Sequence, residues 1–181
     1  MSPDYQIVTQ HLVLRLISSE ESDALQSCVV HSPSLHRWID WCHSGFSLDD
    51  AERFILATRL NWVKSEAYGF GVFCRTSDEL LGMVAINELY HTFNMASIGY
   101  WIADKHQGQG FGAKAINALI EFCFAQLKLT RVEVVCDPDN LPSQKLIESC
   151  GGVFESKARN RFIFNGKPKT GLVYSVIPGS Q

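Results

Sequence analysis

The sequence predicts a mixed α+β fold in which a mostly antiparallel central sheet is flanked by helices in three layers. Three observations support this prediction. Stretches with helical and strand periodicity follow one another in an irregular order rather than as a repeating βαβ array. Consecutive strand patterns are joined by short polar turns, which is typical of antiparallel hairpins. The 181 residues, 46% hydrophobic and 19% charged, suit a single domain spanning residues 1–181.

The first strand is expected in HLVLRLI, residues 11–17, which is rich in branched apolar residues. A capping box follows, because Ser18 precedes Glu21 by three residues. This spacing predicts a helix that runs to about Val30.

Two further helices are expected before the main sheet. Proline suits the first turn of a helix, so a second helix should begin at Pro33 and continue through LHRWIDWC at 35–42. Ser47 and Asp50 have the capping-box spacing and open a third helix. Its apolar stripe consists of Ala51, Phe54, Ile55 and Trp62.

The periodicity then changes to that of strands. YGFGVFCR at 68–75 and ELLGMVAINELY at 79–90 flank a short polar turn and predict a hairpin. MASIGYWIA at 95–103 predicts a third strand in the same run. Helical spacing returns from Phe111, with apolar residues at Ile116, Leu119, Ile120, Cys123, Phe124 and Leu127.

The last third of the chain predicts a strand, a short helix and a hairpin. RVEVVC at 131–136 is the strand, and DPDNLPSQKLIESCGG contains a loop and a helix that ends at glycine. Asn165-Gly166 is a strong turn signal between two further strands.

Composition excludes several classes of protein. The net charge of −3 argues against a general nucleic-acid binder. No apolar run approaches the ~20 residues that cross a membrane, and MSPDYQIVTQHLVL lacks the regions of a signal peptide, so we expect a cytoplasmic protein. No cysteine pair has C-x-x-C spacing, so neither a zinc site nor another metal site is expected, and a disulfide framework is not expected either. The cysteines are Cys28, Cys42, Cys74, Cys123, Cys136 and Cys150.

The segment HQGQGFG at 106–112 concentrates three glycines between a strand and a strong helix. Its G-x-G-x-G spacing after antiparallel strands does not fit a dinucleotide-binding loop, and the Gly-Lys-Ser/Thr of a P-loop is absent. A plain strand-to-helix turn is one alternative. The other is a pyrophosphate cradle, in which bare backbone and the helix N-terminus offer N–H groups to an anion.

Residues Gln107 to Gly112 match the Gln/Arg-x-x-Gly-x-Gly/Ala motif of the Gcn5-related N-acetyltransferases. The surrounding IGYWIADKHQGQGFG and the later DNLPSQKLIESCGG resemble the branch that acetylates the N-termini of ribosomal proteins. The resemblance spans nearly the whole chain. It implies a splayed pair of strands in the sheet, acetyl-CoA as cosubstrate and direct attack of an amine on the thioester.

The resemblance also implies which residues bind the coenzyme. The strand before the loop would pair its backbone with the pantetheine arm, and an amide at Trp101 or Ile102 would bond the thioester carbonyl. The implied coenzyme-binding residues are Tyr100, Trp101, Ile102, Gln107, Gly108, Gln109, Gly110, Phe111, Gly112, Asn140 and Ser143.

Ser143 is the implied catalytic residue that stabilises or protonates the leaving thiolate, although a serine at a helix start is also common in general. Many relatives carry a glutamate on the splayed strand, where this chain has Ser97. Glu88 and His91 remain as candidates for a base that acts through water, and each is otherwise a solvated loop residue. A weak base favours an α-amine, with a pKa near ~7.8, over a lysine near ~10.4.

The family brackets its acceptor groove with the first helices and the last hairpin. The corresponding residues here include Trp38 and Trp41 on one side and Arg159 and Arg161 on the other. The hairpin is basic in an acidic protein, which would attract an acidic partner, unless it is simply a solvated charged surface. Its basic residues are Lys157, Arg159, Arg161, Lys167 and Lys169.

Three functions stay open at this point. The first is acetylation of the N-terminal α-amine of a protein, a ribosomal protein in the resembling branch. The second is acetylation of a small amine such as an amino acid, a polyamine or a drug. The third is a non-catalytic regulator that binds coenzyme A. A homodimer is compatible with each, and Cys136 would form a mixed disulfide with coenzyme A if its thiol faces the coenzyme.

Overall fold

The computed structural model describes residues 1–179, and it confirms the mixed fold with a mostly antiparallel sheet. Eight strands in this part of the chain form one sheet in the order β1-β2-β3-β4-β5-β6-β8-β7. Neighbouring strands are antiparallel except β5 and β6, which are parallel. The strands are β1 Gln6–Val8, β2 Leu12–Arg15, β3 Tyr68–Cys74, β4 Leu80–Tyr90, β5 Met95–Ile102, β6 Arg131–Cys136, β7 Val153–Phe164 and β8 Lys167–Val176.

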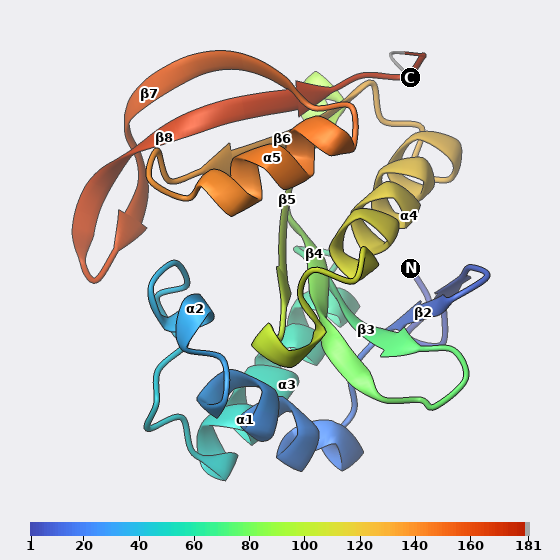
Figure 1. Ribbon diagram of the computed structural model, residues 1–181. Coiled ribbons are helices and arrows are strands. Elements are labelled where there is room, and N and C mark those ends of the chain that lie inside the picture. Colours follow the sequence, from blue (N-terminus) through green and yellow to red (C-terminus); the bar gives the residue numbers. More distant parts are fainter. Residues whose placement is uncertain (180–181) are drawn as a thin grey trace.

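Helices cover both faces of this sheet and create two apolar cores (Figure 1). One core lies between the sheet and the pair α4 and α5, and it includes Ile116, Leu119 and Ile147. The other lies between the sheet and the N-terminal helices, and it includes Leu25 and Ile55. The α-helices are α1 Ser22–Val30, α2 Pro33–His36, α3 Leu48–Lys64, α4 Phe111–Ala125 and α5 Leu141–Ser149. Single 3-10 turns are η1 Ser19–Glu21, η2 His91–Phe93 and η3 Asp104–His106.

Both predicted capping boxes are present. The Ser47 hydroxyl accepts from Asp50 N, and the Asp50 carboxylate accepts from Ser47 N. The Ser18 and Glu21 pair closes in the same way around η1, which leads directly into α1. Local spacing is sufficient for these predictions because a capping box needs only residues within one helical turn.

Two expectations were wrong in extent. The helix predicted through residues 35–42 ends at His36, and turns follow it. The strand β1 was missed; it pairs with β2 over Gln6–Val8. Its three residues offer too short a pattern for a periodicity argument, so only its pairing partner reveals it.

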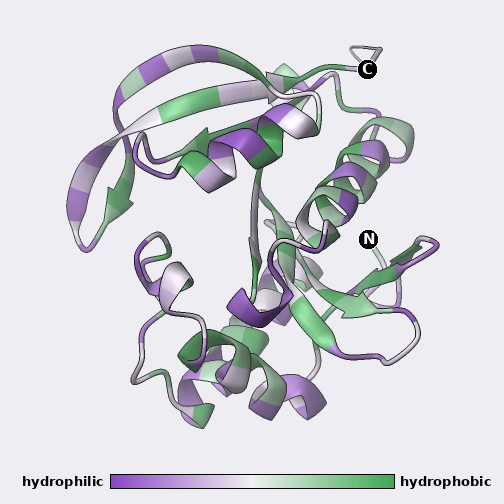
Figure 2. Cartoon of the chain, viewed as in Figure 1, coloured by the Kyte–Doolittle hydropathy of each residue, from purple (hydrophilic) through white to green (hydrophobic). Residues whose placement is uncertain are grey.

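The C-terminal hairpin turns where the sequence predicts. Asn165 and Gly166 have φ of 49° and 69°, which suits a two-residue turn with both central residues left-handed. The hairpin arches over α5, and its tip approaches the segment after α2 (Figure 1). Apolar residues concentrate along β3 and β4, whereas the hairpin carries many hydrophilic ones (Figure 2).

Candidate active site

The strands β5 and β6 separate, as the resemblance implied. Met95–Ser97 of β5 pair with Arg131–Glu133 of β6. Beyond Ser97 and Glu133 the two strands no longer pair with each other. β5 runs on to Ile102 and β6 to Cys136. The inner edges of both strands therefore keep backbone groups available for a ligand.

Backbone direction selects which β5 amides face this opening. The Ala103 N–H donates to Leu81 O of the β4 side at 2.9 Å. Because successive groups of a strand alternate in direction, the amide of Trp101 also faces β4, whereas those of Tyr100 and Ile102 face the opening. β4 and β5 approach so closely here that a Cβ on Gly82 would lie 2.1 Å from Trp101 O. Of the two amides expected to bond a thioester carbonyl, Ile102 has the suitable direction.

The glycines of the 106–112 segment have two different roles. Gly108 and Gly110 have φ of 72° and 79°, and a Cβ on either would meet no atom within 4 Å. Gly110 is also the N-cap of α4 and makes no side-chain cap, so the first amides of α4 are open to an anion. Gly112 differs, because its Cβ would lie 3.1 Å from Leu146 Cδ2 of α5. Its bare backbone allows α4 to pack against α5.

The glutamines of the loop bond to the protein itself. Gln107 Nε2 donates to Ile102 O at 2.8 Å, and Gln109 Nε2 donates to Lys105 O at 3.1 Å. Phe111 packs partly against the core below α4. The loop is thus pre-shaped by its own side chains, and its backbone amides are the groups left for a diphosphate.

Ser143 lies at the junction of three elements. Asn140 caps α5 by accepting from Ser143 N at 3.2 Å, so its side-chain carbonyl is used within the helix start. The Ser143 hydroxyl is 2.9 Å from the Tyr100 hydroxyl of β5 and 3.2 Å from Cys136 Sγ of β6. This polar cluster bridges the two strands on the side of the opening that α5 covers.

Burial keeps this cluster uncharged. Desolvation raises the pKa of Tyr100 well above its usual range, and burial also raises the pKa of the Cys136 thiol. Ser143 therefore has two neutral neighbours, the Tyr100 hydroxyl and the Cys136 thiol, each of which can donate or accept a hydrogen bond. The sequence analysis gave a role only to the backbone of the strand that contains Tyr100 and missed this hydroxyl, because its partner lies 43 positions away.

Glu88 lies on the opposite face of the sheet from this cluster. It is aligned with Ser97, whose neighbours Ala96 and Ile98 point into the core below α4. Its carboxylate accepts a hydrogen bond from the Tyr90 hydroxyl and is exposed. Glu88 thus lies at the base of the opening on the face where α1 and α3 pack, apart from Ser143.

Arg161 is engaged with a partner that the sequence did not reveal. Its guanidinium forms an ion pair with Glu133, a buried carboxylate at the last position where β6 pairs with β5. Glu133 also contacts Arg131 at 3.3 Å. In the sequence, the only sign that Glu133 is special is that it is a charged residue within a strand pattern. Its partner Arg161 lies on β7, so the pair can be recognised only in the folded structure. Arg159 remains exposed.

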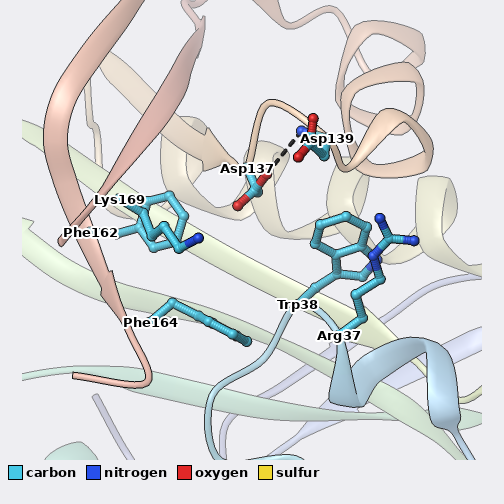
Figure 3. Close-up of a pocket in the computed structure, with 7 residues that line it drawn as sticks. All are labelled: Arg37, Trp38, Asp137, Asp139, Phe162, Phe164 and Lys169. Carbon is cyan, nitrogen blue, oxygen red and sulfur yellow. Dashed lines mark hydrogen bonds between the residues drawn. The ribbon is translucent and has the colours of Figure 1, made fainter. Parts of the chain in front are cut away.

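A cavity of about 140 Å³ opens between the N-terminal helices and the hairpin (Figure 3). Trp38 lines it from one side, with the Arg37 guanidinium 4.5 Å above its ring. The cavity residues are Arg37, Trp38, Asp137, Asp139, Phe162, Phe164 and Lys169. Trp41 is elsewhere; it packs against Phe54, with ring centroids 4.4 Å apart.

Within residues 1–179, no helix is long and apolar enough to cross a membrane. The described side chains also include no group of three or more His, Cys, Asp or Glu positioned to hold a metal ion.

A separated strand pair beside a glycine-rich helix start, with a hydroxyl cluster across the gap, defines a coenzyme-A-dependent N-acyltransferase. The chain belongs to the acetyltransferase (GNAT) domain family, which matches residues 11–153, and it is an N-acetyltransferase.

Two relatives are similar to this chain over nearly its whole length. A solved Vibrio cholerae structure, provisionally described as a ribosomal-protein-serine acetyltransferase, is 60% identical, has a TM-score of 0.93, and covers 98% of this chain and 100% of that chain. The ribosomal-protein-serine acetyltransferase of Escherichia coli is 25% identical over 96% of this chain and 97% of its own length.

A third relative shows the fold alone. It is a ribosomal L7/L12 α-N-protein acetyltransferase, solved in complex with coenzyme A, which is joined to a cysteine of that protein by a disulfide. It is 23% identical, has a TM-score of 0.84, and covers 98% of this chain and 100% of that chain.

Proposed function

We propose that this enzyme transfers an acetyl group from acetyl-CoA to the N-terminal α-amine of a protein, with a ribosomal protein as the acceptor. The observation that carries this proposal is the 60% identity, over nearly the whole chain, to a structure described as a ribosomal-protein-serine acetyltransferase. We further propose that residues 1–181 act as a single N-acetyltransferase domain. Bound acetyl-CoA would supply the acetyl group as an activated thioester.

The residues present fit this coenzyme. Open space at the Cβ positions of Gly108 and Gly110 lets an anionic diphosphate approach the amides at the start of α4. The amides of Tyr100 and Ile102 would bond the pantetheine arm. The Ile102 amide is proposed as the fixed donor to the thioester carbonyl, whose oxygen gains charge as an amine attacks.

Ser143 is proposed to turn its hydroxyl proton from the Tyr100 oxygen to the departing sulfur, while the Tyr100 hydroxyl keeps its place by donating to Ser143 O. A thiol has an ordinary pKa near ~8.5, so stabilisation by a neutral hydroxyl is sufficient. Glu88 is proposed to take the amine proton through water from the opposite face. In this arrangement the proton donor, Ser143, and the proton acceptor, Glu88, lie on opposite faces of the sheet.

The charge of the amine supports an α-amine acceptor. On the order of a tenth of α-amines with pKa near ~7.8 is neutral at pH 7, whereas a lysine near ~10.4 is almost wholly charged. Glu88 is exposed and its carboxylate accepts a hydrogen bond from Tyr90, so an amine that is already partly neutral before it binds suits this site better than a lysine. The cavity beside Trp38 is proposed to receive the residues that follow the acceptor amine.

The test is thiol release from acetyl-CoA with three sets of acceptors. The first contains peptides with free N-termini, including acidic ones that begin with Ser or Ala. The second contains N-blocked peptides with lysine, and the third contains polyamines and amino acids. Turnover confined to the first set supports the proposal. Turnover confined to the third set overturns it in favour of a small-amine acetyltransferase, and binding of coenzyme A without turnover favours a regulator.

A further inference from the structure

Residues 104–112, here called the coenzyme loop, and the short helix α2 cap each other. Ser34 N, in the first turn of α2, donates to Asp104 Oδ2 at 3.2 Å. In return, Asp104 N donates to the Ser32 hydroxyl at 2.9 Å. Ser32 is the N-cap of α2 but makes no side-chain cap within its own helix. Residues some 70 positions apart therefore satisfy each other's helix starts.

Gln107 extends this link into the coenzyme motif. Its Nε2 lies 3.2 Å from Asp104 Oδ1 and 3.1 Å from the Ser34 hydroxyl, and it also donates to Ile102 O. Asp104 additionally accepts a hydrogen bond from the Ser34 hydroxyl. The bonds that the Asp104 carboxylate accepts, from Ser34 and Gln107, are strengthened by its charge, because charge-assisted hydrogen bonds are stronger than neutral ones.

The residues that follow α2 are bonded to the C-terminal hairpin. Asn165 N, in the hairpin turn, donates to Asp40 Oδ1 at 2.7 Å. Between the two ties lie Arg37 and Trp38, which line the cavity (Figure 3). Residues 33–40 thus form a strap that runs from the coenzyme loop to the hairpin tip.

The strap has little stability of its own. A helix of four residues is far below the length that is stable in isolation, so α2 depends on tertiary contacts. Leu35 anchors it in the N-terminal core, and the contacts with Asp104 hold its start. Whatever holds the loop of residues 104–112 in one conformation therefore also stabilises α2 and the wall of the cavity.

We propose that Asp104 is a positioning residue that couples occupancy of the coenzyme loop to ordering of the acceptor cavity. This inference rests on the proposed function, since it takes the loop as the coenzyme site and the cavity as the acceptor site. Coenzyme A binding then orders residues 33–40 and the hairpin turn. By thermodynamic reciprocity, acceptor binding tightens the grip on the coenzyme by the same factor.

The test is amide hydrogen exchange of the full chain with and without coenzyme A, read by mass spectrometry. We expect slower exchange in peptides covering three segments: residues 104–114, residues 33–42 and residues 162–168. The effect in the latter two should be at least about fivefold, the lower end of typical coupling between sites. Protection of residues 104–114 alone would overturn the coupling and leave the proposed function intact. No binding of coenzyme A would overturn both.

Variants identify Asp104 as the link. Asp104→Asn should still bind coenzyme A and protect residues 104–114, but lose protection of the two distant segments. Ser34→Ala, which leaves the Asp104 cap on Ser34 N, gives a milder version if Asp104→Asn folds poorly. Asp23→Asn is the matched control, since Asp23 lies exposed in the first turn of α1. Retained distant protection in both Asp104→Asn and Ser34→Ala would contradict the proposal.

Kinetics give a second readout that a purely structural role would not move. In Asp104→Asn we expect the KM for a free-N-terminus peptide to rise about fivefold or more at saturating acetyl-CoA, with kcat little changed. A fall in kcat with unchanged KM would place Asp104 in the chemistry instead and would contradict the positioning role.

Discussion

The hydroxyl of Tyr100 lies 2.9 Å from the hydroxyl of Ser143, and this contact joins β5 to the start of α5 across the opening in the sheet. Tyr100 also donates to Ser143 O at 3.1 Å, so the phenol is held at two points. The contact fixes the serine rotamer beside Cys136. A single hydroxyl is thereby oriented where the two strands separate.

Ser143→Ala removes this hydroxyl and should lower kcat by about 10²-fold, the lower end of what a positioned proton donor contributes. The dissociation constant for coenzyme A should change by less than about threefold, because backbone amides supply most of the grip. Steady-state kinetics and calorimetry measure the two quantities. Tyr100→Phe is the companion variant and should give a smaller loss, since the serine survives without its support. An unaltered kcat in Ser143→Ala would remove this residue from the mechanism.

Comparing Gly110→Ala with Gly166→Ala separates loss of diphosphate binding at the start of α4 from the backbone strain that alanine introduces at either position. Gly110 and Gly166 both have left-handed φ and open space around a Cβ, so alanine at either should destabilise the fold by about 1 kcal/mol. Gly110→Ala should raise the KM for acetyl-CoA by about tenfold or more, well beyond any change in Gly166→Ala, because only Gly110 starts α4. Thermal unfolding and kinetics on both variants check this. Equal KM values in the two variants would make the loop a plain turn.

Glu155 gives a prediction about acid stability. Hydrogen bonds from Arg131 and Ser175 lower the pKa of Glu155 to about 2. A lowered carboxyl pKa stabilises the fold above the unfolded value and loses that contribution as the pH falls through the folded one. The stability difference between wild type and Glu155→Gln should therefore be constant above about pH 5 and shrink toward pH 2. The carboxylate is partly exposed, so we expect less than about 1 kcal/mol by urea unfolding at each pH.

A difference that grew on acidification would contradict the ion-pair origin of this effect. Glu148→Gln is a suitable control on α5, because it removes a carboxylate that has no arginine partner among the described contacts. Its stability difference should not follow the same pH dependence.

The sequence predicted what depends on neighbouring residues. The capping boxes at Ser18 and Ser47, the turn at Asn165 and the glycine-rich start of α4 all act within a few positions. The length of the helix after Pro33 could not be predicted in the same way, because the contacts that hold α2, to Asp104 and to the core around Leu35, come from distant parts of the chain.

The candidate site divides along the same line. Ser143 and the loop amides belong to a motif, so the sequence was sufficient to propose them. The direction of the Trp101 amide, the Tyr100 hydroxyl and the ion pair that engages Arg161 depend on strand register and on partners far along the chain. Trp38 lines the cavity beside the hairpin whereas Trp41 does not, since the turn geometry over three residues decides which way each ring points.

Cys136 provides the last test, because its thiol lies 3.2 Å from the Ser143 hydroxyl at the proposed sulfur position. In thiol–disulfide exchange, the Cys136 thiolate would attack the disulfide of coenzyme A, form a protein–coenzyme disulfide and release one coenzyme thiolate. The experiment uses a Cys74→Ser background throughout, because Cys74 is only partly buried and hydrogen bonds from Ser77 and Thr76 lower the pKa of its thiol to about 6. In this background intact mass spectrometry should show one adduct per chain. Burial raises the pKa of Cys136, so the rate should be low at neutral pH and rise with pH. Cys136→Ser should abolish the adduct, whereas Cys123→Ser should not, since Cys123 is fully buried within α4. Modification that persists in Cys136→Ser would show that this thiol does not face the coenzyme.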